Sequence, residues 1–142
     1  MHQDFLLTES VVSVIISINR KNRKEILRKK EIRLKKLGII GYGLRSETMM
    51  KAFQGIQAPV QVAAVADPLW CQKQKAFAQT AEFAQTVFYE TAEEMLEKER
   101  LDGVLIGTRC NQHTKYAELV FQKKIPLFLE KPVCINEEQY QR

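Results

Sequence analysis

A short apolar run that ends in two closely spaced glycines is the strongest constraint on the fold of this chain. Residues 37–40 form a predicted strand, followed by Gly41-Tyr42-Gly43 and then by a segment that can be helical. Glycine lets a backbone turn sharply and approach a ligand, and the N–H groups at the start of a helix attract phosphate. The pattern predicts a cradle for a pyrophosphate. The usual third glycine is Ser46 here, and the alternative is a tight turn without a ligand.

Strand-like and helix-like segments alternate along the rest of the chain. Strands are predicted at residues 60–66, 86–89, 102–108 and 125–129, and helices at 45–55, 68–84, 92–100 and 111–124, with another helix starting near 136. Thr91 and Glu94 have the spacing of a capping box. The alternation predicts an α/β fold, a Rossmann-type doubly wound parallel sheet. Ligands of such sheets bind at the carboxyl ends of the strands, so the residues that follow each strand are the candidate site.

Asp67 ends the second predicted strand, at the distance from the glycine loop that dinucleotide-binding domains use. A carboxylate there can accept hydrogen bonds from both hydroxyls of an adenosine ribose, and it would repel a 2′-phosphate. The next residues, Pro68, Leu69 and Trp70, supply no cation. The sequence therefore favours NAD over NADP as cofactor. The alternative is an aspartate that only caps the following helix.

Charge is distributed unevenly along the chain. Residues 1–36 carry 10 Lys/Arg and 4 Asp/Glu, whereas residues 37–142 carry 12 and 13. We interpret 1–36 as a basic extension, poorly ordered or loosely helical, and 37–142 as the dinucleotide-binding domain. The near-neutral domain lacks the electrostatic footprint of a nucleic-acid-binding protein. The apolar stretch at 5–18 is shorter than the ~20 residues that span a bilayer, so no membrane partner is expected; a nucleic-acid- or membrane-binding arm is the alternative.

Cysteine and histidine are scarce. The chain has three cysteines, no Cys-x-x-Cys pair and two histidines. This composition predicts neither a metal cluster nor a disulfide framework, and it favours a reducing, cytoplasmic location.

Four motifs follow one another in a specific order. They are Gly41-Tyr42-Gly43-Leu44-Arg45, Val65-Ala66-Asp67-Pro68, Gly107-Thr108-Arg109-Cys110-Asn111-Gln112-His113 and Leu129-Glu130-Lys131-Pro132-Val133. Together they resemble the N-terminal domain of the glucose–fructose oxidoreductase/inositol dehydrogenase (Gfo/Idh/MocA) family, over residues 37–142. That family often has Thr-Pro-Asn-x-x-His after the fourth strand. Here two residues separate Thr108 from Asn111, so Asn111 is offset from the family pattern.

The resemblance implies the NAD-binding domain of an oxidoreductase that acts on a sugar, polyol or related CH–OH substrate by hydride transfer. It implies that Lys131 is the catalytic residue, lying beside the nicotinamide and assisting proton transfer, and that the Lys131–Pro132 bond is cis. With the glycine loop and Asp67, the expected cofactor-binding residues are Gly41, Tyr42, Gly43, Leu44, Arg45, Asp67, Thr108, Arg109, Asn111, His113, Glu130 and Lys131.

The family fold continues into a sixth strand and a C-terminal α/β domain that holds the substrate pocket, a catalytic histidine and much of the oligomer interface. Residues 37–142 stop before both, so we expect a truncated fold without turnover by itself. A sugar or polyol substrate and a homo-oligomer are then expected only with the second domain. The alternatives are a non-catalytic, regulatory NAD-binding module and an NAD-dependent glycosidase. The strand at 126–129 would be an apolar sheet edge.

Overall fold

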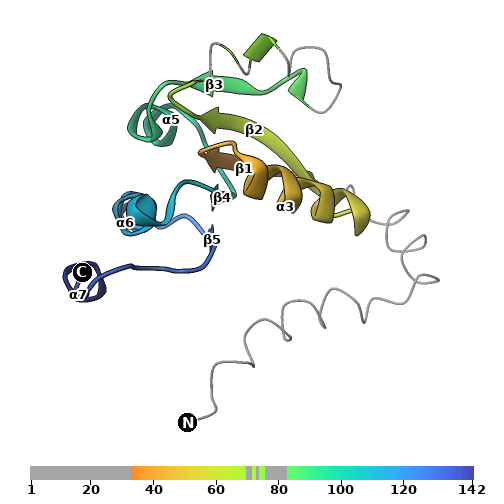
Figure 1. Ribbon diagram of the computed structural model, residues 1–142. Helices are drawn as coiled ribbons and strands as arrows, with labels where there is room; N and C mark the ends of the chain where they lie inside the picture. Colours follow the sequence, from red (N-terminus) through yellow and green to blue (C-terminus); the bar gives the residue numbers. More distant parts are fainter. Residues whose placement is uncertain (1–32, 70–71, 73, 76–82) are drawn as a thin grey trace. The chain divides into compact units, whose positions relative to one another are not determined.

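The computed structural model describes residues 33–69, 72, 74–75 and 83–142 (Figure 1). By its internal contacts the chain divides into two units, Met1–Arg33 and Leu34–Arg142. The second unit contains the elements described here. In chain order they are β1 Lys35–Ile40, α3 Leu44–Gly55, β2 Val60–Ala66, β3 Val87–Tyr89, α5 Ala92–Lys98, β4 Gly103–Ile106, the 3₁₀ turn η2 Cys110–Gln112, α6 His113–Gln122, β5 Leu127–Leu129 and α7 Glu137–Tyr140.

The strands of this unit form a five-stranded sheet in the order β3-β2-β1-β4-β5. Each described neighbouring pair is parallel, with Ile40 opposite Ala66 on β2 and Ile106 on β4. Parallel strands need crossover connections, and the intervening helices provide them. This confirms the predicted α/β sheet and its alternation of strands and helices.

Helices cover both faces of the sheet, as Figure 1 shows for α3 on one side and for α5 and α6 on the other. On the α3 side, Ile39 and Leu105 belong to the same buried cluster as Met50. On the opposite side, Ile40 and Ile106 form a cluster with residues of α5 and α6, namely Ala92, Met95, Leu96, Ala117 and Val120. Successive residues of a strand point to opposite faces, which is why Ile39 and Ile40 enter different clusters. The sheet is therefore doubly wound.

The strand boundaries differ from the predicted ones by a few residues. β1 begins at Lys35 rather than at Leu37, because Lys35 and Lys36 pair with Val60 and Gln61 of β2 although both lysines are exposed. A search for apolar runs cannot detect such a strand start. β4 and β5 are shorter than predicted, and the helix predicted at 68–84 falls mostly outside the described residues.

Helix α5 begins at the predicted cap. The Glu94 backbone N–H donates to Thr91 Oγ1 over 3.2 Å, and acidic residues occupy the first turn, where they face the positive end of the helix dipole. The Glu94 carboxylate does not return to the backbone of Thr91 as a capping box would have it. It pairs with Lys98 one turn further on.

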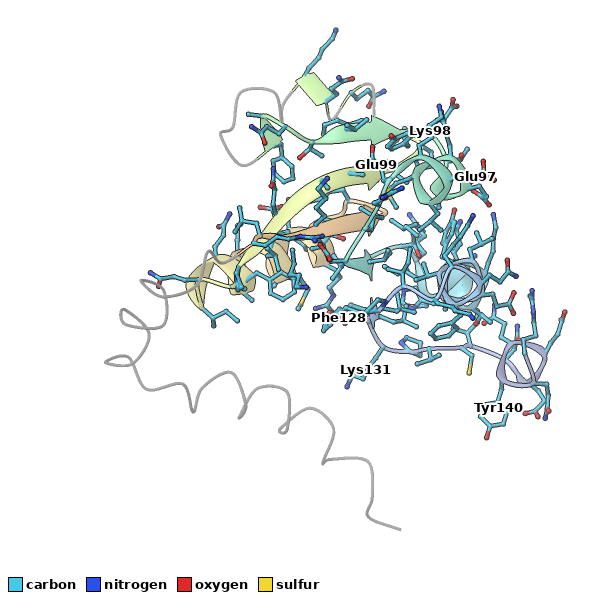
Figure 2. All side chains as sticks on the ribbon, turned by 180° about the vertical axis from the view of Figure 1, so that it is seen from behind. Glu97, Lys98, Glu99, Phe128, Lys131 and Tyr140 are labelled. Atoms are coloured by element: carbon cyan, nitrogen blue, oxygen red, sulfur yellow. The ribbon has the colours of Figure 1, made fainter. Side chains whose placement is uncertain are left out.

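β5 forms one edge of the sheet, as predicted. Its central residue Phe128 is 43% exposed, and Figure 2 shows it at the margin of the molecule. No helix within the described part of the chain is long and apolar enough to cross a membrane.

Candidate dinucleotide-binding site

The predicted site residues all follow the carboxyl ends of parallel strands, along the side of the sheet where these strands end. Gly41-Tyr42-Gly43 follows β1, Asp67 follows β2, and Thr108 and Lys131 come after β4 and β5. The order of the strands places the glycine loop in the centre, between the loops that follow β2 and β4. Contacts between these loops decide which of the residues form one site.

Two features of Gly41, its backbone conformation and its close neighbours, disfavour any side chain at this position. Its φ is +77°, in the left-handed region that favours glycine. A Cβ at this position would also lie 2.7 Å from Thr108 Cγ2 and 3.1 Å from the Thr108 backbone nitrogen. The first glycine of the loop is thus required by the close approach of the β4 loop as well as by the turn.

Gly43 faces open space at the start of α3. A Cβ added there would have no neighbour within 4 Å, and the following residues Leu44 and Arg45 are exposed. The first N–H groups of a helix lack partners within the helix, and they carry partial positive charge. An open surface over these groups is the feature that a phosphate needs.

Ser46 stands where the usual fingerprint has its third glycine, and the lack of a side chain at Gly107 leaves the space that it fills. The side chain is completely buried, and its hydroxyl donates to the Gly41 carbonyl oxygen over 2.7 Å. Gly107, which follows β4, lies so close that an added Cβ would overlap the Ser46 hydroxyl oxygen. Local sequence patterns do not reveal this pair, and its only signal in the sequence is the glycine directly after the apolar β4 run.

Asp67 joins the loop that follows β2 to the glycine loop. One carboxylate oxygen accepts the Tyr42 N–H over 2.8 Å and the other accepts the Leu69 N–H over 2.9 Å. The second bond is the capping contact of the alternative interpretation, and the first holds the glycine loop. Asp67 is only 6% exposed, and Tyr42 uses its N–H here while its ring packs edge-on against Phe83.

His113, at the start of α6, connects two further loops. Its Nε2 lies 3.1 Å from the Thr108 carbonyl oxygen and its Nδ1 lies 2.7 Å from that of Pro132. The ring is 2% exposed. The Lys131–Pro132 bond is cis, as predicted. Lys131 itself is exposed, and Figure 2 shows its side chain projecting away from the loop after β5.

Arg109, Asn111 and Glu130 are farther from the role predicted for them, because the hydrogen bonds given for the described residues link none of the three to the glycine loop. Arg109 and Asn111 are exposed, and the Asn111 carbonyl oxygen accepts a hydrogen bond from the Gln139 side chain of α7. Glu130 is half-buried next to Lys131. The arrangement therefore gives a core site of Gly41, Gly43 and Asp67, and leaves these residues at its margin.

No group of three or more metal-ligating side chains occurs among residues 33–69, 72, 74–75 and 83–142. Cys110 and Cys134 are free thiols, and Cys71 lies outside the described residues.

A strand that turns through Gly41 into an open helix start, with a buried carboxylate at the end of the next strand, is the geometry of a dinucleotide-binding sheet. Residues 35–142 match the family model described as "Oxidoreductase family, NAD-binding Rossmann fold". The chain belongs to the Gfo/Idh/MocA family. This confirms the resemblance found in the sequence.

A curated member of the family is similar to most of this chain. It is the rhizopine catabolism protein MocA of Rhizobium meliloti, 30% identical over 104 residues, which are 73% of this chain and 31% of that protein. The chain thus spans about a third of the length of its relative.

Solved structures from the family share the fold of the chain. One is the WlbA dehydrogenase of Bordetella pertussis in complex with NADH and UDP-GlcNAcA, with a TM-score of 0.66, 21% identity, and coverage of 77% of this chain and 30% of that one. Another is the scyllo-inositol dehydrogenase of Lactobacillus casei with NAD(H) and scyllo-inositol, with a TM-score of 0.64, 20% identity, and coverage of 75% and 31%. At these identities the Gfo/Idh/MocA structures establish the fold alone.

Proposed function

We propose that this chain is the cofactor-binding part of an oxidoreductase that uses NAD(H) and acts on a CH–OH group of a sugar, polyol or related substrate. The observation that carries the proposal is the open helix start at Gly43, bordered by a glycine loop whose conformation Asp67 and Thr108 hold. Such a loop presents backbone N–H groups to a pyrophosphate without prior reorganisation.

Asp67 supports a preference for NAD over NADP. Its two bonds to backbone N–H groups, from Tyr42 of the glycine loop and from Leu69, hold the negative charge at the end of β2, where the ribose of a dinucleotide lies in sheets of this kind. A 2′-phosphate would bring negative charge next to a buried carboxylate, at a strong Coulomb cost in a low-dielectric surrounding.

Lys131 is the group that we assign to the substrate. It lies after β5, at the same sheet edge as the cradle, and its exposed ammonium can hydrogen-bond a substrate hydroxyl and assist movement of its proton. Bound NAD would accept the hydride from the substrate carbon. The names of the solved relatives, which include a UDP-sugar complex and an inositol dehydrogenase, favour a polyhydroxylated substrate.

The decisive experiment is a calorimetric titration of the purified 142-residue chain with NAD and, in parallel, with NADP. We expect saturable binding of NAD, and binding of NADP at least about tenfold weaker because one pair of close like charges costs more than about 1.4 kcal/mol at a partly buried site. Failure to bind either dinucleotide, in a chain shown by circular dichroism to be folded, would overturn the proposal.

A charge-removing variant tests the role of Asp67. Asp67→Asn keeps the size of the side chain and removes the negative charge, so the affinity for NADP should approach that for NAD. The matched control is Glu97→Gln, which removes an exposed carboxylate on α5, away from the strand ends, and should leave the preference unchanged. If both variants keep the wild-type preference, Asp67 does not set it.

A further inference from the structure

We infer that His113 is a positioning residue that couples the cofactor cradle to Lys131, an inference that rests on the proposed function. The reason is the location of its two partners. Thr108, which Nε2 contacts, follows β4, and Pro132, which Nδ1 contacts, follows β5. A single buried ring thus spans two strand-end loops of the site.

Each partner is adjacent to a group that the proposed function uses. The Thr108 backbone is in close contact with Gly41, since a Cβ on Gly41 would lie 3.1 Å from the Thr108 Cα. Pro132 directly follows Lys131. A shift of the Thr108 carbonyl is therefore transmitted through one imidazole to the backbone next to the lysine.

The helix start makes a second contact to the same loop. Thr114, which is 7% exposed, donates its hydroxyl to the Val133 carbonyl oxygen over 3.2 Å. Two consecutive residues of α6 therefore hold two consecutive carbonyl groups after Lys131. The loop has no regular secondary structure between β5 and α7, so these side-chain bonds, rather than a ladder, fix its path.

The chemistry of imidazole suits this bridging position better than other side chains do. The two ring nitrogens lie on opposite sides of a rigid ring, so one imidazole can lie against both carbonyl oxygens. Carbonyl oxygens only accept hydrogen bonds, so a neutral ring donates to one of them through its single N–H and an imidazolium ring donates to both. An asparagine amide carries both of its hydrogens on one nitrogen, so it can replace at most one of the two contacts. Alanine replaces neither.

Hydrogen exchange of the backbone tests the inference without any cofactor. In His113→Ala we expect the amides of residues 130–135 (Pro132 has none), above all that of Ile135, which donates to Gln139 Oε1 over 3.0 Å, to exchange about tenfold faster than in the wild type. We expect an intermediate rate in His113→Asn, because loss of hydrogen bonds raises local opening. The matched control is Val120→Ala, which shortens a fully buried side chain of the same helix in the apolar cluster beneath it and removes neither of the two side-chain contacts to the loop. Equal acceleration of 130–135 in the control and in His113→Ala would show a general loss of stability and overturn the inference.

If His113→Ala does not fold, Thr114→Val provides the test, because it removes one bond to the loop and retains the shape of the side chain. It should accelerate exchange at 130–135 by a few fold and leave β1 unchanged. Unchanged exchange at 130–135 in this variant would contradict the inference.

A second readout tests the coupling to the cradle. Acylation of Lys131 by a water-soluble N-hydroxysuccinimide ester is measured with and without NAD, with Lys98 of α5 as internal reference (Figure 2). We expect NAD to slow the modification of Lys131 several fold in the wild type and in Val120→Ala, and much less in His113→Ala at saturating NAD. Equal protection of Lys131 in the wild type and in His113→Ala, or no protection in the NAD-saturated wild type, would overturn the coupling.

Absence of NAD binding by the wild type would instead contradict the proposed function. Hydrogen exchange would then still decide whether His113 fixes the loop.

Discussion

Replacing Gly107 with alanine should destabilise the domain strongly, and the cause should be Ser46. The added methyl group would overlap the Ser46 hydroxyl oxygen and would lie 3.0 Å from the Gly41 carbonyl oxygen. The hydroxyl can rotate away from the methyl group, but it then leaves the Gly41 carbonyl, to which it donates over 2.7 Å. The contact with the Gly41 carbonyl belongs to the backbone, so side-chain rotation does not relieve it.

The size of the effect follows from these two contacts. Leaving a fully buried hydroxyl without a partner costs about 1–3 kcal/mol, and forcing a methyl group into a packed contact costs about 1–3 kcal/mol. Gly107→Ala should therefore lower the free energy of unfolding by about 2–6 kcal/mol. Ser46→Ala alone removes one hydrogen bond and should cost about 1 kcal/mol.

The double variant distinguishes this mechanism from a general intolerance of the β4 loop. In Ser46→Ala/Gly107→Ala the hydroxyl is absent, so the double variant should be more stable than the sum of the single effects by about 1–3 kcal/mol. The control is Thr48→Ala, which removes a hydroxyl bonded to the Leu44 carbonyl in the same helix, away from Gly107. Its effect should add to that of Gly107→Ala within about 0.5 kcal/mol.

Urea unfolding followed by circular dichroism measures these free energies for each variant. If Gly107→Ala is too unstable to fold, recovery of folding by Ser46→Ala gives the same information. A Gly107→Ala variant as stable as the wild type, or strict additivity with Ser46→Ala, would show that the hydroxyl does not occupy the space that Gly107 leaves.

Two further predictions concern hydrogen bonds outside the site. Burial of the phenol, together with its 2.6 Å hydrogen bond to the Glu99 carboxylate, raises the pKa of Tyr89 from 10.0 to about 12. The phenol of the folded state therefore keeps its proton to a higher pH than that of the unfolded state. This difference stabilises the fold fully below pH 10.0, and the stabilisation is lost as the pH rises toward about 12. Tyr89→Phe should flatten the resulting alkaline decline in the free energy of unfolding, measured by urea titrations at a series of pH values. Thr91→Ala should lower the free energy of unfolding by about 1 kcal/mol through loss of the cap on Glu94, and Thr91→Ser should restore most of it; equal stabilities of the two variants would contradict a capping role.

The sequence was sufficient to predict the order of the strands and helices because the strands are covered on both faces. Runs such as Val104–Ile106 are apolar without alternation, and that pattern indicates burial on both sides. The start of β1 was not predictable in this way. Lys35 and Lys36 belong to the strand through backbone pairing alone, which leaves no trace in hydrophobicity.

The candidate site was predictable only where its residues act locally. Gly41 and Asp67 could be singled out because a turn and a strand end have spacing rules. Asp67 accepts the Leu69 N–H, as a capping aspartate does, and its bond to the glycine loop belongs to neither interpretation, while its contact with a ribose stays a prediction. The contacts of Ser46 with Gly107 and of His113 with Pro132 join residues from separate elements. Such contacts exist only once the sheet has formed, so no local pattern contains them.

The position of β1 in the sheet has a consequence for the order in which the domain can fold. β1 is the first strand of the sheet along the chain, yet it lies in the centre, between β2 and β4. Its pairing with β2 closes a short segment that contains α3, whereas its pairing with β4 must wait until β2, β3 and α5 have been synthesised. Pairing across a longer segment costs more chain entropy and is slower. The strand that carries the glycine loop therefore emerges first and is enclosed late, and the cradle at its end is complete only when Gly107 and Thr108 reach Gly41.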